Sequence, residues 1–212
     1  MKLITALLTV ASLFILNLSS CGGADEIQEQ TSKKFQLNSH PKQAYRLNIK
    51  IIDAPGPLQL MGDLNINYVA RNCSYVVSRF EGVSANPKKL VENKVRQLRP
   101  FEYETIVHID AMKDEDYFGQ GICHWEPDGF GIAFKAAGKP NETKFNFGDF
   151  LNDLIAKKSI TKYYWKWAYP YSKNEGGMLY TDSVDFGIIS PELYNAQDQK
   201  KMFTITIIIE KV

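Results

Sequence analysis

The chain has 212 residues and a mass of 24.1 kDa; 44% of the residues are hydrophobic and 23% are charged. This composition is typical of a globular protein and excludes a collagen-like, disordered or multi-span membrane protein. There are 25 Lys and Arg residues against 24 Asp and Glu residues, so the formal net charge is +1. Nucleic-acid binding depends on an excess of cations against phosphate, so this balance argues against DNA or RNA as a partner.

The chain begins with an apolar segment. Lys2 is the only charged residue before an apolar run at residues 3–18. The run is shorter than the ~20 residues that a membrane-spanning helix needs, so it predicts a secretory signal. The sequence Leu18-Ser19-Ser20-Cys21 follows and resembles the lipobox of bacterial lipoproteins. The resemblance implies cleavage before Cys21 and lipidation of its sulfur; the alternative is a cysteine that follows an ordinary cleavage site by chance.

The residues after Cys21 extend this interpretation. Gly22, rather than Asp, follows the cysteine, which resembles the pattern that routes lipoproteins to the outer membrane, facing the periplasm. Residues 21–43 are mostly polar and lack apolar periodicity, which is typical of a flexible tether. We therefore expect a signal peptide at 1–20, a lipidated tether at 21–43 and one strand-rich globular domain at 44–212.

The two remaining cysteines are Cys73 and Cys123. A pair of cysteines in an exported chain predicts a disulfide, because secreted proteins do not meet a reducing glutathione pool. Two buried free thiols are the alternative. A cysteine nucleophile is disfavoured, because neither residue lies in a context that would lower the thiol pKa, such as a helix N-terminus.

Most of the chain after residue 44 has the period-two pattern of β-strands with one buried face. The segments with this pattern are 45–51, 64–68, 73–77, 101–109 and 203–209. The last of them is rich in isoleucine, which predicts a central strand. Segments 121–125 and 130–134 flank Glu126-Pro127-Asp128-Gly129, whose residues favour a turn, so a hairpin is expected there.

Three helices are expected. Asn86-Pro87 is typical of a helix start, and the helix would end before Pro100. A second helix is expected at 150–158 and a short third one at 190–199, opened by Ser190-Pro191. Strands with a few inserted helices predict a mostly β, α+β fold: a single sandwich-like antiparallel domain.

Catalytic signals are weak. His108 and Asp110 would share a strand face with Glu102 and Glu104, which would suit a metal or acid–base site completed by His124 or Glu126; a solvated strand face is the other interpretation. The chain has no Gly-x-Ser-x-Gly, His-Glu-x-x-His or Walker motif. We therefore expect no catalytic residues, no metal and no cofactor, and the chain is not predicted to be an enzyme.

The most unusual segment is the aromatic run at residues 163–171. As one extended strand it would place five rings on a single face: Tyr163, Trp165, Trp167, Tyr169 and Tyr171. Tyr and Trp dominate protein interfaces and also stack on sugars, so the rings predict a protein-binding or glycan-binding surface; a role in the core is the alternative. Acidic side chains could form the rim of such an interface and steer a basic partner. They are Glu102, Glu104, Asp114, Glu115 and Asp116.

In general character, a lipid-tethered, strand-rich domain with paired cysteines and no catalytic set resembles the immunity lipoproteins that protect bacteria against type VI secretion toxins, particularly phospholipase effectors. The resemblance implies a stoichiometric inhibitor that binds a toxin in the periplasm. The alternative expectation is a lipoprotein of envelope assembly, or one that binds glycans or solutes, without catalytic activity.

Overall fold

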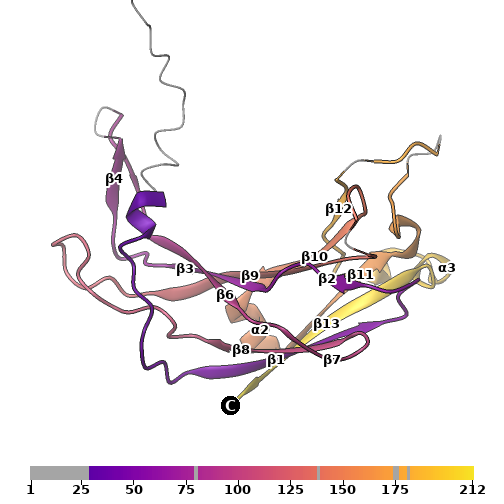
Figure 1. The fold of residues 1–212 in the computed structure, drawn as a ribbon, viewed down its shortest axis with the longest axis horizontal. Helices are drawn as coiled ribbons and strands as arrows, with labels where there is room; N and C mark the ends of the chain where they lie inside the picture. Colours follow the sequence, from indigo (N-terminus) through magenta and orange to yellow (C-terminus); the bar gives the residue numbers. More distant parts are fainter. Residues whose placement is uncertain (1–28, 79–80, 138, 174–176, 181) are drawn as a thin grey trace, which may run out of the picture.

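The computed structural model describes residues 29–78, 81–137, 139–173, 177–180 and 182–212. The expected signal peptide, Cys21 and the start of the expected tether lie outside these residues. The described chain is mostly β with a few short helices, so the expected α+β, sandwich-like fold class is confirmed. Two sheets form the layers of the sandwich, and a separate hairpin projects from one end (Figure 1).

The lower layer in Figure 1 is an antiparallel five-stranded sheet with the strand order β11-β13-β1-β8-β7. Its strands are β1 (Ala44–Ile52), β7 (Arg96–Arg99), β8 (Glu102–His108), β11 (Ser159–Trp165) and β13 (Met202–Lys211). β13 is the expected isoleucine-rich strand, and it pairs with β1 on one side and β11 on the other. The prediction of an interior position is therefore confirmed.

The upper layer is a six-stranded sheet with the order β12-β10-β9-β3-β6, in which β2 also pairs with β9. Its strands are β2 (Gln59–Leu60), β3 (Leu64–Val69), β6 (Lys88–Asn93), β9 (Glu126–Lys135), β10 (Lys144–Phe150) and β12 (Val184–Asp185). The projecting hairpin consists of β4 (Tyr75–Ser78) and β5 (Val83–Ala85).

Alternate side chains of the two sheets fill the space between the layers, as the period-two pattern predicts. Those from the five-stranded sheet include Leu47, Ile49, Tyr103, Val107, Tyr164, Phe203, Ile205 and Ile207. Those from the six-stranded sheet include Leu64, Ile66, Tyr68, Phe130, Ile132, Phe134, Phe145 and Phe147. The outer face of that sheet carries mainly small and polar residues, together with the exposed Leu90 opposite Asn67 and the exposed Phe150 opposite Gly129.

The helices are short. They are α2 (Leu151–Lys157), α3 (Ala196–Gln199) and the 3-10 turns η1 (Lys166–Ala168) and η2 (Pro191–Leu193). The expected helix at 150–158 is confirmed as α2, which leads from one sheet to the other and buries Leu151 and Leu154. The expected helix at 190–199 is present as η2 followed by α3.

The expected helix between Asn86 and Pro100 is wrong: the segment forms β6 and β7. β6 pairs along its whole length with β3, which satisfies its backbone groups across the sheet. The Asn86 side chain does not cap a helix; it donates to the Cys73 carbonyl at 2.7 Å. Pairing with a distant strand therefore overrides the local helix signal.

The expected hairpin around residues 126–129 is also wrong, because β9 continues through them. β9 lies between β3 and β10, and this pairing on both edges holds the segment extended. Pro127 lies near the start of the strand, where the register with β3 shifts at a bulge, a position at which proline is tolerated.

The domain begins earlier than the sequence predicts. The Phe35 side chain is 5% exposed and belongs to the main core, where its ring packs edge-on against Tyr117 and Trp125. The backbone N–H of Asn38 donates to the Ala111 carbonyl at 2.8 Å. The expected flexible tether at 21–43 therefore ends before Phe35.

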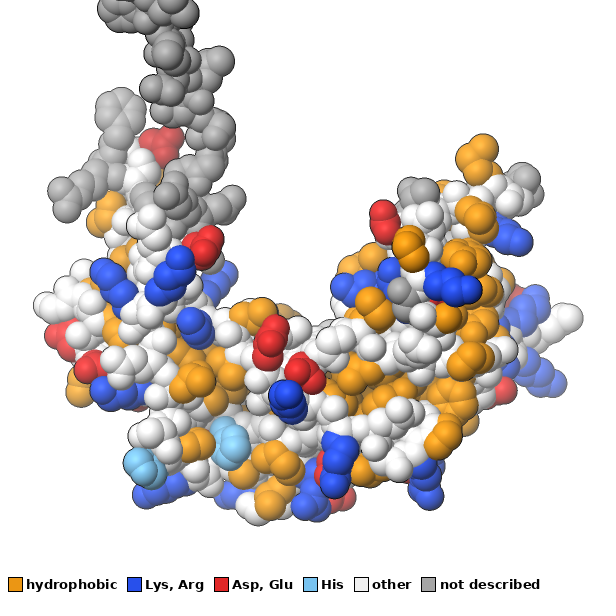
Figure 2. Space-filling view, in the orientation of Figure 1, with side chains coloured by type: hydrophobic (Ala, Val, Ile, Leu, Met, Phe, Trp, Pro, Cys, Tyr) orange, Lys and Arg blue, Asp and Glu red, His pale blue; other side chains and the backbone are white. Residues whose placement is uncertain are grey.

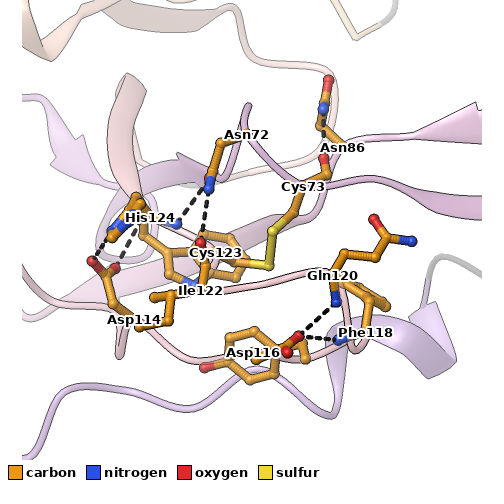
Figure 3. The surroundings of a disulfide bond; sticks show 12 residues. Asn72, Cys73, Asn86, Asp114, Asp116, Phe118, Gln120, Ile122, Cys123 and His124 are labelled. Carbon is orange, nitrogen blue, oxygen red and sulfur yellow. Dashed lines mark hydrogen bonds and ion pairs between the residues drawn. A yellow bond between two sulfur atoms is a disulfide. The ribbon is translucent and has the colours of Figure 1, made fainter.

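Cys73 and Cys123 form the expected disulfide (Figure 3). The bond joins the base of the β4–β5 hairpin to the loop that precedes β9. The Asn72 side chain reinforces the same junction, since its Nδ2 donates to the Ile122 carbonyl at 2.8 Å and its Oδ1 accepts from the His124 N–H at 2.9 Å. The hairpin therefore has a firmly attached base.

Candidate functional site

The outer face of the six-stranded sheet forms the floor of a saddle between two projections (Figures 1 and 2). The first arm is the β4–β5 hairpin at one end of the strands. The second arm consists of residues 171–173, 177–180 and 182–183 at the other end, where the Lys173–Leu179 bridge and the Tyr180 N–H, which donates to the Ser172 carbonyl, hold these residues together. Both arms rise on the same side of the molecule.

Three glycines lie side by side on the saddle floor. Gly129 and Gly131 alternate with buried residues on β9, and Gly131 pairs directly with Gly148 on β10. We call Gly129, Gly131 and Gly148 the glycine strip. Glycine weakens the interior of a strand, and it often marks a place where a ligand or another backbone approaches closely.

The fold itself does not require two of these glycines. A Cβ atom at Gly129 would lie 3.6 Å from the Asp149 carbonyl oxygen, and one at Gly131 would lie 3.7 Å from that of Phe147; both are ordinary contact distances. A Cβ at Gly148 would lie 3.3 Å from the Phe130 carbonyl oxygen, which is tighter. In the part of the chain that the structure describes, no side-chain atom outside the adjacent residues lies within 4 Å of a Cβ built at Gly129 or Gly131, so this part of the floor is open.

Polar side chains surround the strip. The floor contains a hollow of about 250 Å³ whose lining includes Asp63, Asn65 and Asn67 from β3 and its approach, and Lys144 and Asn146 from β10. An asparagine amide carries both donors and acceptors, so it can bond to either group of a peptide backbone or to a sugar hydroxyl. The floor is therefore suited to hydrogen bonding with a bound partner.

Exposed apolar side chains gather around the second arm. Among the described residues, nine of the 21 large hydrophobic side chains classed as exposed lie between residues 167 and 194. They are Trp167, Met178, Leu179, Tyr180, Val184, Phe186, Ile189, Leu193 and Tyr194. Figure 2 shows hydrophobic side chains over the arm that bounds the saddle on its right. Clustered exposed apolar residues mark interaction surfaces more often than scattered ones do.

The aromatic run does not form one strand face, so that expectation is wrong. β11 ends at Trp165, and η1 turns the chain directly after it. Tyr163 and Trp165 lie on the outer side of β11, Trp167 is 58% exposed on η1, and Tyr169 donates its hydroxyl to the Pro57 carbonyl at 3.0 Å. Tyr171 is half-buried at the base of the second arm.

Part of the aromatic run nevertheless forms a surface cluster. The rings of Trp165 and Trp167 lie 6.4 Å apart, and Trp165 packs edge-on against Tyr194 at 5.1 Å. Tyr194 was missed by sequence reasoning, because it comes from the segment after η2, which only the tertiary structure brings to β11. The cluster lies at the edge of the sandwich next to the second arm.

The expected acidic rim is not present as a single surface. Glu102 and Glu104 lie on the outer face of the five-stranded sheet, away from the saddle, and both carboxylates are paired with cations. The hydrogen bond from Arg99 holds the pKa of Glu102 below its usual range. Cations from β1 and β7 therefore surround both carboxylates, and these two residues do not share a surface with the other three acidic residues.

The other three acidic residues lie in the loop before β9, near the disulfide (Figure 3). Asp114 contacts the His124 ring at 2.7 Å, and Glu115 pairs with Lys113 at 3.0 Å. Asp116 accepts from the backbone N–H groups of three residues in its own turn, and these bonds outweigh the effect of burial and lower its pKa. These carboxylates hold the loop together.

The residues considered for chemistry are also separated. Asp110 binds the backbone N–H groups of Lys42 and Gln43, at 2.8 and 3.0 Å, and so anchors the chain before β1. His124 pairs with Asp114 in the loop before β9. Among the described residues, no group of three or more His, Cys, Asp or Glu side chains is placed to hold a metal ion.

The glycine strip was not recognised from the sequence. Gly129 was interpreted as part of a turn with Pro127 and Asp128. The usable signal was the alternation of glycine with aromatic residues in Gly129-Phe130-Gly131 and in Phe147-Gly148, which indicates a strand with one bare face.

Comparisons of this chain with models of protein families, with curated proteins and with solved structures found no match. Within the part of the chain that the structure describes, no helix is both long and apolar enough to cross a membrane. The functional assignment therefore depends on the geometry of the saddle and on the N-terminal sequence.

Proposed function

We propose that this chain is a lipid-anchored periplasmic binding protein that neutralises a secreted antibacterial toxin by holding it in the saddle. The observation that carries the proposal is the glycine strip, which lies between the two arms and which the fold does not require to be glycine at Gly129 or Gly131. The resemblance to immunity lipoproteins gives the toxin class, for which a type VI phospholipase effector is the specific candidate.

The saddle offers what a protein interface needs. Apolar side chains around the second arm supply area that can be desolvated, and Tyr180 among them is of a residue type that dominates binding energies. The asparagines of the floor supply hydrogen bonds around the strip. An interface of the standard ~1,600 Å² could include the floor and one arm.

The lipid anchor would place this site where a membrane-attacking toxin works. Acylation of Cys21 would confine the domain to a thin layer beside the bilayer, which raises its effective concentration without any new contact. Metabolic labelling with a radioactive fatty acid tests this step: we expect label on the wild type and none on Cys21→Ser. An unlabelled wild type would remove the anchor from the proposal.

A competition assay tests the function. Cells that lack the gene are complemented with wild type, Gly131→Val or Ser159→Val, and are then exposed to a competitor that delivers the toxin. Gly131→Val fills the saddle floor, whereas Ser159→Val places the same apolar side chain on the outer face of the five-stranded sheet. We expect protection from the wild type and from Ser159→Val, and loss of protection with Gly131→Val at unchanged protein level. Equal protection by all three variants would reject the saddle as the toxin site.

The polar floor favours a second candidate, a lipoprotein that binds envelope glycans. Asp63 and three asparagines line the hollow, and such side chains suit sugar hydroxyls. Titration with soluble cell-wall fragments separates the two functions. Binding that Asn65→Ala and Asn146→Ala weaken would favour the glycan function, and an absence of binding would exclude it.

A further inference from the structure

Both arms of the saddle carry exposed apolar side chains. On the first arm, Val76 is 55% and Val83 is 46% exposed. On the second arm, Met178 is 72%, Leu179 48% and Tyr180 53% exposed. The arms project from opposite ends of the same sheet, so these side chains form two separate apolar points rather than one continuous patch (Figure 1).

The described chain begins on the same side of the molecule. The helical turn at residues 29–32 lies beside the first arm, and the Ser32 carbonyl accepts a hydrogen bond from the Lys89 Nζ of β6 at 2.9 Å (Figure 1). Residues 21–28 lie between this turn and the sulfur of Cys21. Eight residues reach at most about 29 Å, since a fully extended chain spans no more than ~3.6 Å per residue. A lipid on Cys21 would therefore keep this turn, and the first arm beside it, within about 29 Å of the bilayer surface.

We infer that these exposed apolar side chains of both arms dock on the lipid bilayer that holds Cys21, with the saddle opening toward the headgroups. The inference rests on the lipid anchor in the proposed function, but it does not depend on the toxin. The exposed side chains of the first arm, those of the second arm and the acyl chain give three points of attachment. A bilayer is a flat surface that can meet all three at once.

The chemistry of the described residues of the second arm fits an interfacial position. Tyrosine is enriched at membrane–water interfaces, because its ring is apolar and its hydroxyl remains hydrated. Lys173 is exposed beside Leu179, to which it is bridged, and its ammonium group favours anionic headgroups. A small number of apolar side chains binds a bilayer only weakly, so those of the two arms act by orienting a domain that the acyl chain already holds. The saddle would then face the layer in which a membrane-attacking toxin works.

Vesicle binding tests the inference without the acyl chain. The mature chain with Cys21→Ser is mixed with vesicles of phosphatidylethanolamine and phosphatidylglycerol and then sedimented. We expect measurable binding, and at least a tenfold weaker partition coefficient for the double variant Leu179→Asp and Tyr180→Asp. Val76→Asp on the first arm provides an independent variant, for which a reduction is also expected. Leu98→Asp is the matched control, because Leu98 is 49% exposed on β7, away from the arms.

Circular dichroism confirms that each variant is folded before it is scored. Absence of vesicle binding by the parent chain would overturn the inference, as would equal reductions by Leu98→Asp and the arm variants. Toxin affinity is measured separately in solution. If the arm variants lose toxin affinity and keep vesicle binding, the arms belong to the protein interface and lipid docking is rejected. If the arm variants lose vesicle binding and Leu98→Asp keeps it, lipid docking is supported, whether or not the proposed toxin binds.

Discussion

The Nζ of Lys162 on β11 donates a hydrogen bond at 2.6 Å to the carbonyl of Gly148 on β10. Two residues further along, the Tyr164 hydroxyl donates to the Asn146 carbonyl at 3.1 Å. β12 pairs with β10 only at Lys144 and Phe145, so the rest of that edge has no neighbouring strand. The Lys162 and Tyr164 side chains of the five-stranded sheet thus make hydrogen bonds that a neighbouring strand would otherwise make. They hold the free edge of β10, the strand that carries Gly148.

Lys162 should make stability depend on pH. Burial lowers the pKa of its ammonium group below the ordinary 10.5, although the nearby Asp149 opposes this shift. Between the lowered pKa and 10.5 the unfolded chain binds more protons than the folded chain, so the free energy of unfolding rises with pH in this window. We expect the rise in the wild type and not in Lys162→Met, measured by urea unfolding at pH 7 and pH 9.5.

The same variant removes the donor to the Gly148 carbonyl, which should cost about 1–3 kcal/mol at pH 9.5. The comparison stops at pH 9.5, because burial raises the pKa of Tyr164 and of other tyrosines, and their ionisation in the unfolded chain lowers stability at higher pH. Identical pH profiles for wild type and Lys162→Met would show that Lys162 is not the source of the rise.

Two glycines should respond in opposite ways to alanine. A Cβ at Gly131 meets only an ordinary contact, and glycine is unfavourable in a strand, so Gly131→Ala should leave stability unchanged or raise it by up to about 1 kcal/mol. Gly187 has a φ of +66°, and a Cβ there would lie 2.8 Å from the Tyr164 ring. Gly187→Ala should therefore cost about 2 kcal/mol or more. Thermal unfolding of both variants checks the contrast, and a destabilised Gly131→Ala would mean that the fold does require the bare floor.

Loss of the disulfide should destabilise the domain strongly. Cys73 and Cys123 are 50 residues apart in sequence, and the chain-entropy relation gives about 4 kcal/mol for closing such a loop. We expect the Cys73→Ser and Cys123→Ser double variant to lose about 2–5 kcal/mol in urea unfolding. Wild type in a reducing buffer serves as the control and should lose a similar amount; a loss below 1 kcal/mol in both would contradict the prediction.

Asp185 should destabilise the domain when it is charged. Burial raises the pKa of its carboxyl above 3.8, although hydrogen bonds from the Gly187 and Trp165 backbone N–H groups oppose this shift. Stability therefore falls as pH rises from 3.8 through the raised pKa. Asp185→Asn keeps an oxygen acceptor for Gly187, so at pH 7 it should be at least as stable as wild type. Urea unfolding of both proteins at pH 4 and pH 7 checks this expectation. It would be contradicted if the stability of Asp185→Asn relative to wild type were clearly lower at pH 7 than at pH 4.

The sequence pattern located most strands because alternation records which side chains meet the core. The segments at 45–51, 64–68, 101–109 and 203–209 form β1, β3, β8 and β13. The pattern was misleading where local signals competed with distant pairing. Asn86-Pro87 is typical of a helix start and Pro127 to Gly129 of a turn, yet both lie in or beside strands that are fixed by β3.

The candidate site was largely beyond sequence reasoning. The aromatic run was recognised as unusual, but its turn at η1 and its contact with Tyr194 depend on the segment that covers the edge of β11. The expected acidic rim is not a single surface, and the cations that pair with Glu102 and Glu104 come from two other strands, β1 and β7, whose register cannot be obtained from one sequence.

The amino-acid sequence by itself determined the β-rich class, the interior position of the last strand and the pairing of the two body cysteines, because periodicity and cysteine number are properties of the chain alone. The saddle was decided only by the tertiary structure. Gly131 and Gly148 come from different strands, and the two arms come from segments about 90 residues apart; only the pairing of β9 with β3 and β10 places them around one floor. Glycines on separate strands form one continuous floor only when strand pairing places them next to each other.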